Sequence, residues 1–270
     1  MLEVLNETVE WLKTRIPAET KIGIILGTGL GDLANNIKNK REIPYEEIPH
    51  FPVSTVEGHS GKLIIGTLGE KPILAMQGRF HYYEGYNMQD VTFPIRVMQF
   101  LGITHLFVSN AAGGMNRSFE VGDIMLIEDH INLFPEHPLR GRNLPEFGVR
   151  FPDMSEAYDM NLRKLAIKIA HDNNIKLQYG VYVGTQGPTF ETPAEYTYFN
   201  IIGGDAVGMS TVPEVIVAIH AGIKVLAFSI ITDLGVPGRV EKVSHEEVLK
   251  AAKIAQPKMA FIMEEVIKLI

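Results

Sequence analysis

Short runs of aliphatic residues alternate along this chain with longer segments whose apolar positions recur at helical spacing. The runs are continuous, as in IGIIL at 22–26 and VLAFSII at 225–231, and do not alternate with polar residues. A strand that is apolar on both sides is covered on both faces, which is typical of parallel sheets between layers of helices. The pattern therefore predicts a single-domain α/β protein with a central, mostly parallel but mixed sheet flanked by helices.

The predicted elements follow from these runs and from the turn residues between them. The predicted strands are 22–26, 62–68, 72–76, 105–109, 123–127, 181–184 and 225–231. The predicted helices are 4–15, 89–101, 159–173, 194–201, 213–221 and 244–270. Ser244 and Glu247 form a capping box for the last helix, and Pro257 is expected to kink or divide it. No repeat or polar linker divides the chain, so we expect one domain over 1–270.

Composition excludes several classes of protein. The chain has no cysteine, which rules out disulfides, thiolate metal sites and cysteine nucleophiles. Its formal net charge of −7 provides no basic surface for nucleic acid. The most apolar stretch, 215–231, is interrupted by His220 and Lys224 and is too short for a membrane helix. The first residues have helical rather than signal-peptide patterning, so we expect a cytoplasmic protein without membrane or nucleic-acid partners.

Loops that follow strands are the candidate binding segments, because ligands of such sheets bind at the carboxyl ends of the strands. The glycine-rich loop 27–31 (GTGLG) can bring backbone N–H groups and a hydroxyl to an anion, or it can be an ordinary tight turn. In the next such loop, Arg79 and His81 suit a tetrahedral oxyanion such as phosphate. The alternative is a solvated arginine and a histidine that only packs.

Two later segments can likewise be interpreted either as part of a binding site or as ordinary structural residues. The small residues at 109–114 (SNAAGG) let the main chain lie against a ligand, unless Asn110 simply caps a helix. Phe190 offers a face for stacking a flat ring, and Glu191 offers a carboxyl group for the edge of that ring.

The segment 207–211 (VGMST) is equally open to two interpretations. Val207 and Met209 alone are typical core residues, and Ser210 with Thr211 is a plausible cap for the next helix. Together, however, these loops supply an anion site and an aromatic face with a carboxylate. A nicotinamide cofactor is not indicated, because the glycine fingerprint for dinucleotides is missing.

At these positions the chain closely resembles the trimeric family of purine nucleoside phosphorylases. The segments that carry the resemblance keep the family's order and spacing, and they are 27–31, 58–61 (GHSG), 77–85 (QGRFHYYEG), 110–114 (NAAGG), 120–125 (EVGDIM), 129–132 (DHIN), 187–192 (GPTFET), 207–214 (VGMSTVPE) and 245–248 (HEEV). The resemblance implies reversible phosphorolysis of purine nucleosides and deoxynucleosides in purine salvage. It also implies the nucleoside phosphorylase fold.

The resemblance assigns the site residues by position. The implied phosphate site consists of Thr28, His59, Arg79, His81, the main chain at Ala111, and Ser210. The implied nucleoside site consists of Tyr83, Phe151, Phe190, Glu191, Val207, Met209, Thr232, Asp233 and His245. The catalytic residues among them are His81, Glu191 and Asp233. Phe151 matches an aromatic residue that reaches a neighbouring subunit's sugar pocket, which implies a homotrimer. No metal or cofactor is implied, because inorganic phosphate is the second substrate.

Asp233 is the departure that bears on substrate choice. The 6-oxopurine enzymes of the family carry Asn here, and relatives that cleave methylthioadenosine carry Asp but lack the matches to Glu191 and His245. Ionised Asp only accepts hydrogen bonds, so it suits a 6-amino group better than an O6 atom. We therefore expect an enzyme for inosine and guanosine that also accepts adenosine. A methylthioadenosine phosphorylase, a phosphate-independent nucleoside hydrolase and a non-catalytic nucleoside-binding protein are the alternatives.

Overall fold

The computed structural model describes the chain except residues 28–30, 54–60, 237, 241 and 243, and it describes residues 31, 32 and 245 by their backbone alone. The strands are β1 (Ile22–Leu26), β2 (Lys38–Pro44), β3 (Lys62–Leu68), β4 (Lys71–Gln77), β5 (His105–Gly114), β6 (Ile124–Asn132), β7 (Gln178–Gly184), β8 (Ala206–Gly208) and β9 (Lys224–Leu234). The helices are α1 (Leu2–Lys13), α2 (Met88–Phe100), α3 (Met160–Asp172), α4 (Pro193–Ile201), α5 (Val212–His220) and α6 (His245–Lys268).

The strands form one mixed sheet in the order β2-β3-β4-β1-β5-β8-β7-β6-β9. Its centre is parallel, since β1 pairs in parallel with β4 and β5, and β5 pairs in parallel with β9. One edge is antiparallel, where β3 lies between β2 and β4. Because β5 pairs with both β8 and β9, the strands from β5 to β9 close on themselves. The predicted single-domain α/β architecture with a mixed sheet is confirmed.

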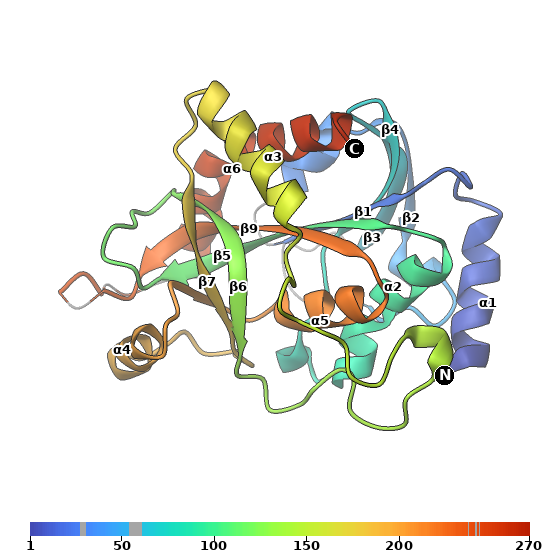
Figure 1. The fold of residues 1–270 in the computed structure, drawn as a ribbon, viewed down its shortest axis with the longest axis horizontal. Helices are drawn as coiled ribbons and strands as arrows, with labels where there is room; N and C mark the ends of the chain where they lie inside the picture. Colours follow the sequence, from blue (N-terminus) through green and yellow to red (C-terminus); the bar gives the residue numbers. More distant parts are fainter. Residues whose placement is uncertain (28–30, 54–60, 237, 241, 243) are drawn as a thin grey trace.

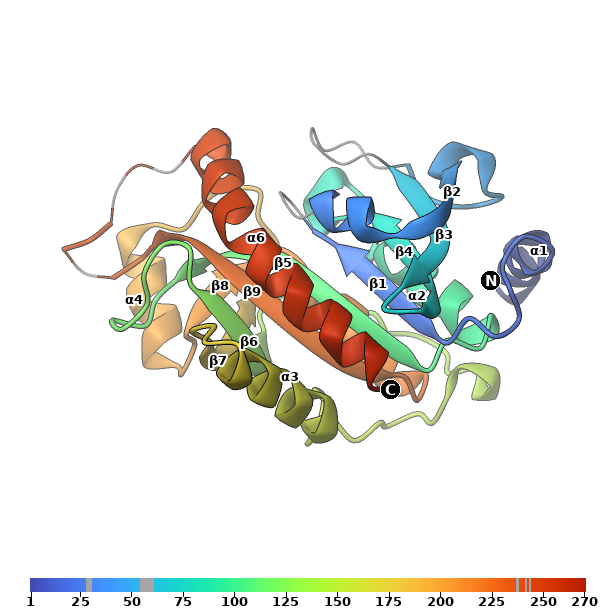
Figure 2. The same cartoon turned by 90° about the horizontal axis from the view of Figure 1, so that it is seen from above.

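Helices cover both faces of the sheet, which explains why its strands are apolar on both sides. Helices α3 and α6 lie on one face, and α2 and α5 lie on the other (Figures 1 and 2). In β1, Ile24 packs into the core on the side of α3 and α6, whereas Ile25 packs into the core on the side of α2 and α5. Successive side chains of a strand point to opposite faces, so a strand between two helical layers has no solvent-facing position.

Two strands are not predicted by the sequence pattern, and three others continue well past their predicted ends. Five of the seven residues of β2 are exposed, so this edge strand has no apolar run, and β8 has only three residues. The sequence pattern predicts strand ends at residues 109, 127 and 231, but β5, β6 and β9 continue to Gly114, Asn132 and Leu234. The small residues at the end of β5 are therefore part of the sheet and pair with β9.

Helix α6 is continuous from His245 to Lys268, with Pro257 inside it. The proline therefore does not divide the helix. The expected capping box is confirmed, because Ser244 Oγ accepts from the Glu247 backbone N–H and the Glu247 side chain accepts from the Ser244 backbone N–H. In the described part of the chain, none of the helices combines the length and apolar character that crossing a membrane requires.

Candidate active site

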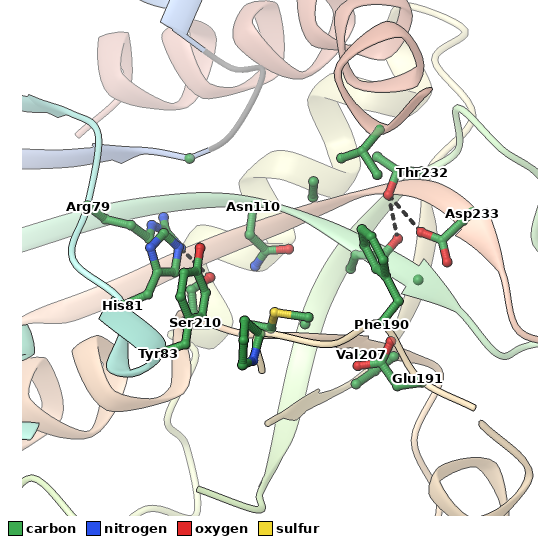
Figure 3. A pocket seen from close by; sticks show the side chains of 18 residues that line it. Arg79, His81, Tyr83, Asn110, Phe190, Glu191, Val207, Ser210, Thr232 and Asp233 are labelled. Atoms are coloured by element: carbon green, nitrogen blue, oxygen red, sulfur yellow. Dashed lines mark hydrogen bonds between the residues drawn. The ribbon is translucent and has the colours of Figure 1, made fainter. Parts of the chain in front are cut away.

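A cavity of about 290 Å³ lies beyond the ends of β1 and β4, beside the last residues of the paired strands β5 and β9. It is lined by Gly27, Arg79, His81, Tyr83, Asn110, Ala111, Ala112, Gly113, Pro188, Phe190, Glu191, Val207, Gly208, Met209, Ser210, Thr232, Asp233 and Val248. Figure 3 shows that the polar groups gather at two ends. Arg79, His81 and Ser210 lie at one end, which we call the anion end. Glu191 and Asp233 lie at the other, which we call the base end.

Arg79 is the fixed cation of the anion end, and only 2% of its surface is exposed. Its Nη1 donates to Ser210 Oγ at 2.6 Å and to Thr211 Oγ1 at 3.1 Å. Its Nη2 donates to the Ser109 carbonyl oxygen at 2.6 Å, and its Nε lies 3.7 Å from Glu214 Oε1. A buried charge needs such partners to offset its lost hydration. The guanidinium is therefore held in one orientation at the cavity wall, where its positive charge attracts an anion.

Neither helix-cap interpretation describes the side chains at this end. Asn110 lies within β5, and its Nδ2 donates to Thr211 Oγ1 at 2.8 Å. Thr211 does occupy the residue before α5, but its side chain makes no capping hydrogen bond. Its φ of 72° is unusual for a β-branched residue. Backbone strain of this kind persists where surrounding contacts enforce it, and here it directs the hydroxyl to Arg79 and Asn110.

His81 is oriented by Glu84, three residues along the chain. Glu84 Oε1 lies 3.0 Å from His81 Nδ1 and also accepts from the His81 backbone N–H at 2.8 Å. The ring of Tyr83 stacks on the imidazole with the two centroids 4.7 Å apart. Burial lowers the pKa of His81 more than the Glu84 carboxylate raises it. The carboxylate therefore fixes the ring position, while burial favours the neutral imidazole at neutral pH.

The base end combines an apolar wall with two carboxyl groups. Val207 on β8 is buried and also lines the cavity, so its core role and its site role coincide. Phe190 is 43% exposed and lies on the same side of the cavity as Glu191 (Figure 3). Burial raises the pKa of Glu191 to about 7, and the charge of Asp233 adds to that rise. Burial also raises the pKa of Asp233.

Most of the predicted site residues meet in this one cavity. Those that line it are Arg79, His81, Tyr83, Ala111, Phe190, Glu191, Val207, Met209, Ser210, Thr232 and Asp233. Thr28 and His59 lie outside the described residues, and so does the side chain of His245, the first residue of α6. Phe151 lies elsewhere, at a second cavity beside Arg150, and is 87% exposed.

The structure also adds residues that the sequence did not assign. Glu84 and Glu214 support the two basic side chains of the anion end, and Val248 on α6 lines the cavity. Glu84 could have been found from its capping-box spacing after His81, which the structure confirms. Tyr196 on α4 contacts Asp233 from outside the lining, and nothing in its local sequence pattern distinguishes it from a core aromatic residue.

The chain belongs to the Phosphorylase superfamily, whose family description matches residues 21–268. It is 53% identical to purine nucleoside phosphorylase 1 of Bacillus subtilis, over 94% of this chain and 93% of that protein. It is 49% identical to purine nucleoside phosphorylase of Rattus norvegicus, over 95% of this chain and 91% of that protein. The resemblance seen in the sequence motifs is therefore confirmed.

Solved structures show the same relationship. The crystal structure of Schistosoma mansoni purine nucleoside phosphorylase in complex with adenosine matches this fold with a TM-score of 0.93 and 45% identity, covering 98% of this chain and 96% of that chain. The complex of a Schistosoma mansoni purine nucleoside phosphorylase with inosine matches with a TM-score of 0.92 and 44% identity, covering 99% and 96%.

Proposed function

We propose that this chain is a purine nucleoside phosphorylase, which converts purine nucleosides and deoxynucleosides reversibly to free base and ribose or deoxyribose 1-phosphate. The observation that carries the proposal is one cavity with a fixed guanidinium and hydroxyl groups at one end and an aromatic face with two carboxyl groups at the other. About 50% identity to proteins of this activity supports it. Residues 1–270 then form one phosphorylase domain. Purine salvage acts on intracellular nucleosides, and we place the enzyme in the cytoplasm.

The proposed chemistry requires positioning and electrostatics rather than a covalent intermediate. As the glycosidic bond breaks, the ribose gains positive charge and the purine gains negative charge. Phosphate at Arg79, His81 and Ser210 faces the cationic sugar and then bonds to its anomeric carbon. Thr28, His59 and the main chain at Ala111 complete the proposed phosphate site. Fixed donors stabilise the developing charges most strongly where water is excluded. The proposed reaction uses phosphate as the second substrate and needs no further cofactor.

The nucleoside lies between the two ends in this proposal. Tyr83, Met209 and His245 contact the ribose, while Phe190 and Val207 hold the faces of the base. Glu191 reads the pyrimidine edge, and Thr232 and Asp233 read the imidazole side and the 6-position. We propose inosine, guanosine and adenosine as substrates. The crystal structures of related phosphorylases with adenosine and with inosine support a site that admits both kinds of purine.

The ionisation of Glu191 should make base preference depend on pH. The ionised carboxylate accepts from the N1–H of inosine, whereas the protonated form donates to the bare N1 of adenosine. With a pKa of about 7, the ionised fraction rises roughly tenfold between about pH 6 and pH 8. We expect the kcat/KM of inosine relative to adenosine to rise over this range. Titration of phosphate and of His81 affects both nucleosides equally and therefore cancels in this ratio of kcat/KM values. Glu191→Gln should make the ratio independent of pH. A flat parent profile would contradict the assignment.

Phe151 should act in the active site of a neighbouring subunit, as the segment Arg150-Phe151-Pro152 implies. Its 87% exposure leaves an aromatic ring available to another subunit. We expect a homotrimer in sedimentation experiments and a raised nucleoside KM for Phe151→Ala. Val149→Ala, at an exposed residue two positions before Phe151, is the control and should keep the parent KM. A fully active monomer would refute both the assembly and the shared site.

Base release from inosine separates the candidate functions. A phosphorylase releases hypoxanthine only when phosphate is present. A nucleoside hydrolase would continue without phosphate, and a nucleoside-binding protein would release no base in either condition. Parallel reactions with guanosine, adenosine and methylthioadenosine then define the substrate range. We expect phosphate-dependent release from inosine, and phosphate-independent release would overturn the proposal.

A further inference from the structure

Tyr196 makes a contact at the base end that neither the sequence motifs nor the proposed chemistry uses. Its side chain on α4 is buried, with 3% of the residue exposed, and its hydroxyl donates to Asp233 Oδ2 at 2.7 Å. Two glycines make room for it. A Cβ at Gly235 would come within 2.0 Å of the Tyr196 ring, and a Cβ at Gly113 would lie 2.9 Å from both the Tyr196 hydroxyl and Asp233 Oδ2. Three separate segments therefore accommodate this one contact.

The second carboxylate oxygen of Asp233 also accepts a hydrogen bond from a hydroxyl group. Thr232 Oγ1 donates to Asp233 Oδ1 at 3.0 Å. Hydrogen bonds donated to a carboxylate favour its ionised form, and they oppose the rise in the pKa of Asp233 that burial causes. Burial and the charge of Asp233 raise the pKa of Tyr196 well above its ordinary value, so the phenol stays protonated and remains a donor. The two hydroxyl groups thus hold Asp233 in one orientation, and their hydrogen bonds favour the carboxylate form of its side chain.

We propose that Tyr196 is a specificity-determining residue, which fixes Asp233 as the hydrogen-bond acceptor for an amino group at C6 of the purine. The inference rests on the proposed function and deepens it. Each carboxylate oxygen has more than one lone pair, so Asp233 can accept from the phenol and from the substrate together. Ionised Asp233 has no hydrogen to give to an O6 atom. Tyr196 therefore acts on substrate choice through Asp233, without contact with the base.

The choice of substrates must isolate the 6-position from the other groups nearby. Glu191 interacts electrostatically with both Tyr196 and Asp233. Two basic residues, Arg239 and Lys242, line an adjoining cavity that also borders Asp233. Adenosine and purine riboside both have a bare N1 atom, and they differ only in the amino group at C6. Their ratio of kcat/KM therefore cancels the contribution of Glu191 at N1 and the contribution of the phosphate site.

The first test is this ratio in the parent and in Tyr196→Phe. Phenylalanine keeps the ring for which the glycines make room and removes only the donor. We expect the adenosine-to-purine-riboside ratio to fall about tenfold, the effect of one hydrogen bond to a charged group. The kcat/KM of purine riboside itself should change little. Tyr198→Phe is the matched control, since Tyr198 lies on the same helix and is 51% exposed, and it should leave the ratio unchanged.

A double-mutant cycle shows whether Tyr196 acts through Asp233. In an Asp233→Asn background, Tyr196→Phe should no longer lower the ratio. Thr232→Val removes the other hydroxyl donor to Asp233 and should also lower the ratio. This second variant tests the inference even if Tyr196→Phe does not fold. An unchanged ratio in these variants, or an equal fall with and without Asp233, would overturn the inference. Inosine is assayed in the same samples, and a parent that releases no base from any nucleoside would overturn the proposed function instead.

Discussion

Replacing Arg79 by alanine is expected to lower kcat/KM for phosphate by a factor on the order of 10²–10³, the usual cost of removing one fixed donor from such a site. The nucleoside KM should change far less, because the base end lies at the other end of the cavity (Figure 3). Initial rates with phosphate varied at saturating inosine, and then with inosine varied at saturating phosphate, separate the two effects.

The alanine variant also leaves the Glu214 carboxylate buried beside an empty position, which destabilises a fold by about 3–5 kcal/mol. Arg79→Lys avoids this loss because it keeps the positive charge while removing the planar fork. We expect its phosphate dependence to lie between those of the parent and Arg79→Ala. Arg163→Ala, at an arginine that pairs with Glu128 on the surface, is the control. A variant of Arg79 with parental phosphate dependence would show that the anion end has been misassigned.

Replacing Asp233 by asparagine is expected to lower the specificity constant for adenosine relative to inosine by about 10–150-fold, the range for a hydrogen bond to a charged group. The carboxylate accepts from a 6-amino group, whereas the asparagine amide can donate to O6. In the parent, Tyr196 and Thr232 hold the carboxylate in place, so the substitution changes the donor pattern at a fixed position.

The experiment compares kcat/KM for the two nucleosides in the parent and in Asp233→Asn. Inosine should remain a substrate of the variant, because the proposed contact of Glu191 with its N1 edge is unchanged. Asp172→Asn, at an exposed residue ending α3, serves as the control for a loss of negative charge. If the ratio stays within about a factor of two in Asp233→Asn, Asp233 does not read the base.

Much of the fold follows from local sequence signals. The continuous apolar runs predict β1 and β3 with their observed bounds, because all five residues of β1 and four of the seven residues of β3 are buried. The last residues of β5 resisted prediction because small residues such as Ala112 and Gly113 are typical of loops. Here they extend the strand because β9 pairs with them along its length. Strand β2 depends in the same way on its partner β3.

The site residues also fall into two groups, those that the sequence predicts and those that depend on contacts between distant segments. Arg79, His81 and Glu191 could be predicted, because their residue types and spacing match a family pattern. Tyr196 could not, because the role we propose for it depends on its contact with Asp233, which lies 37 residues further along the chain, and on the space left by Gly113 and Gly235. Contacts of this kind form only in the folded chain, where Tyr196 meets the ends of β5 and β9, and no local pattern records them.

In the proposed reaction, phosphate bound at the anion end replaces the purine held at the base end. Phosphorus-31 NMR of the enzyme with inosine and phosphate tests it most directly, together with chromatography of the released base. We expect one equivalent of ribose 1-phosphate for each equivalent of hypoxanthine, and no hypoxanthine when phosphate is left out. Hypoxanthine released with free ribose and without a sugar phosphate would contradict it.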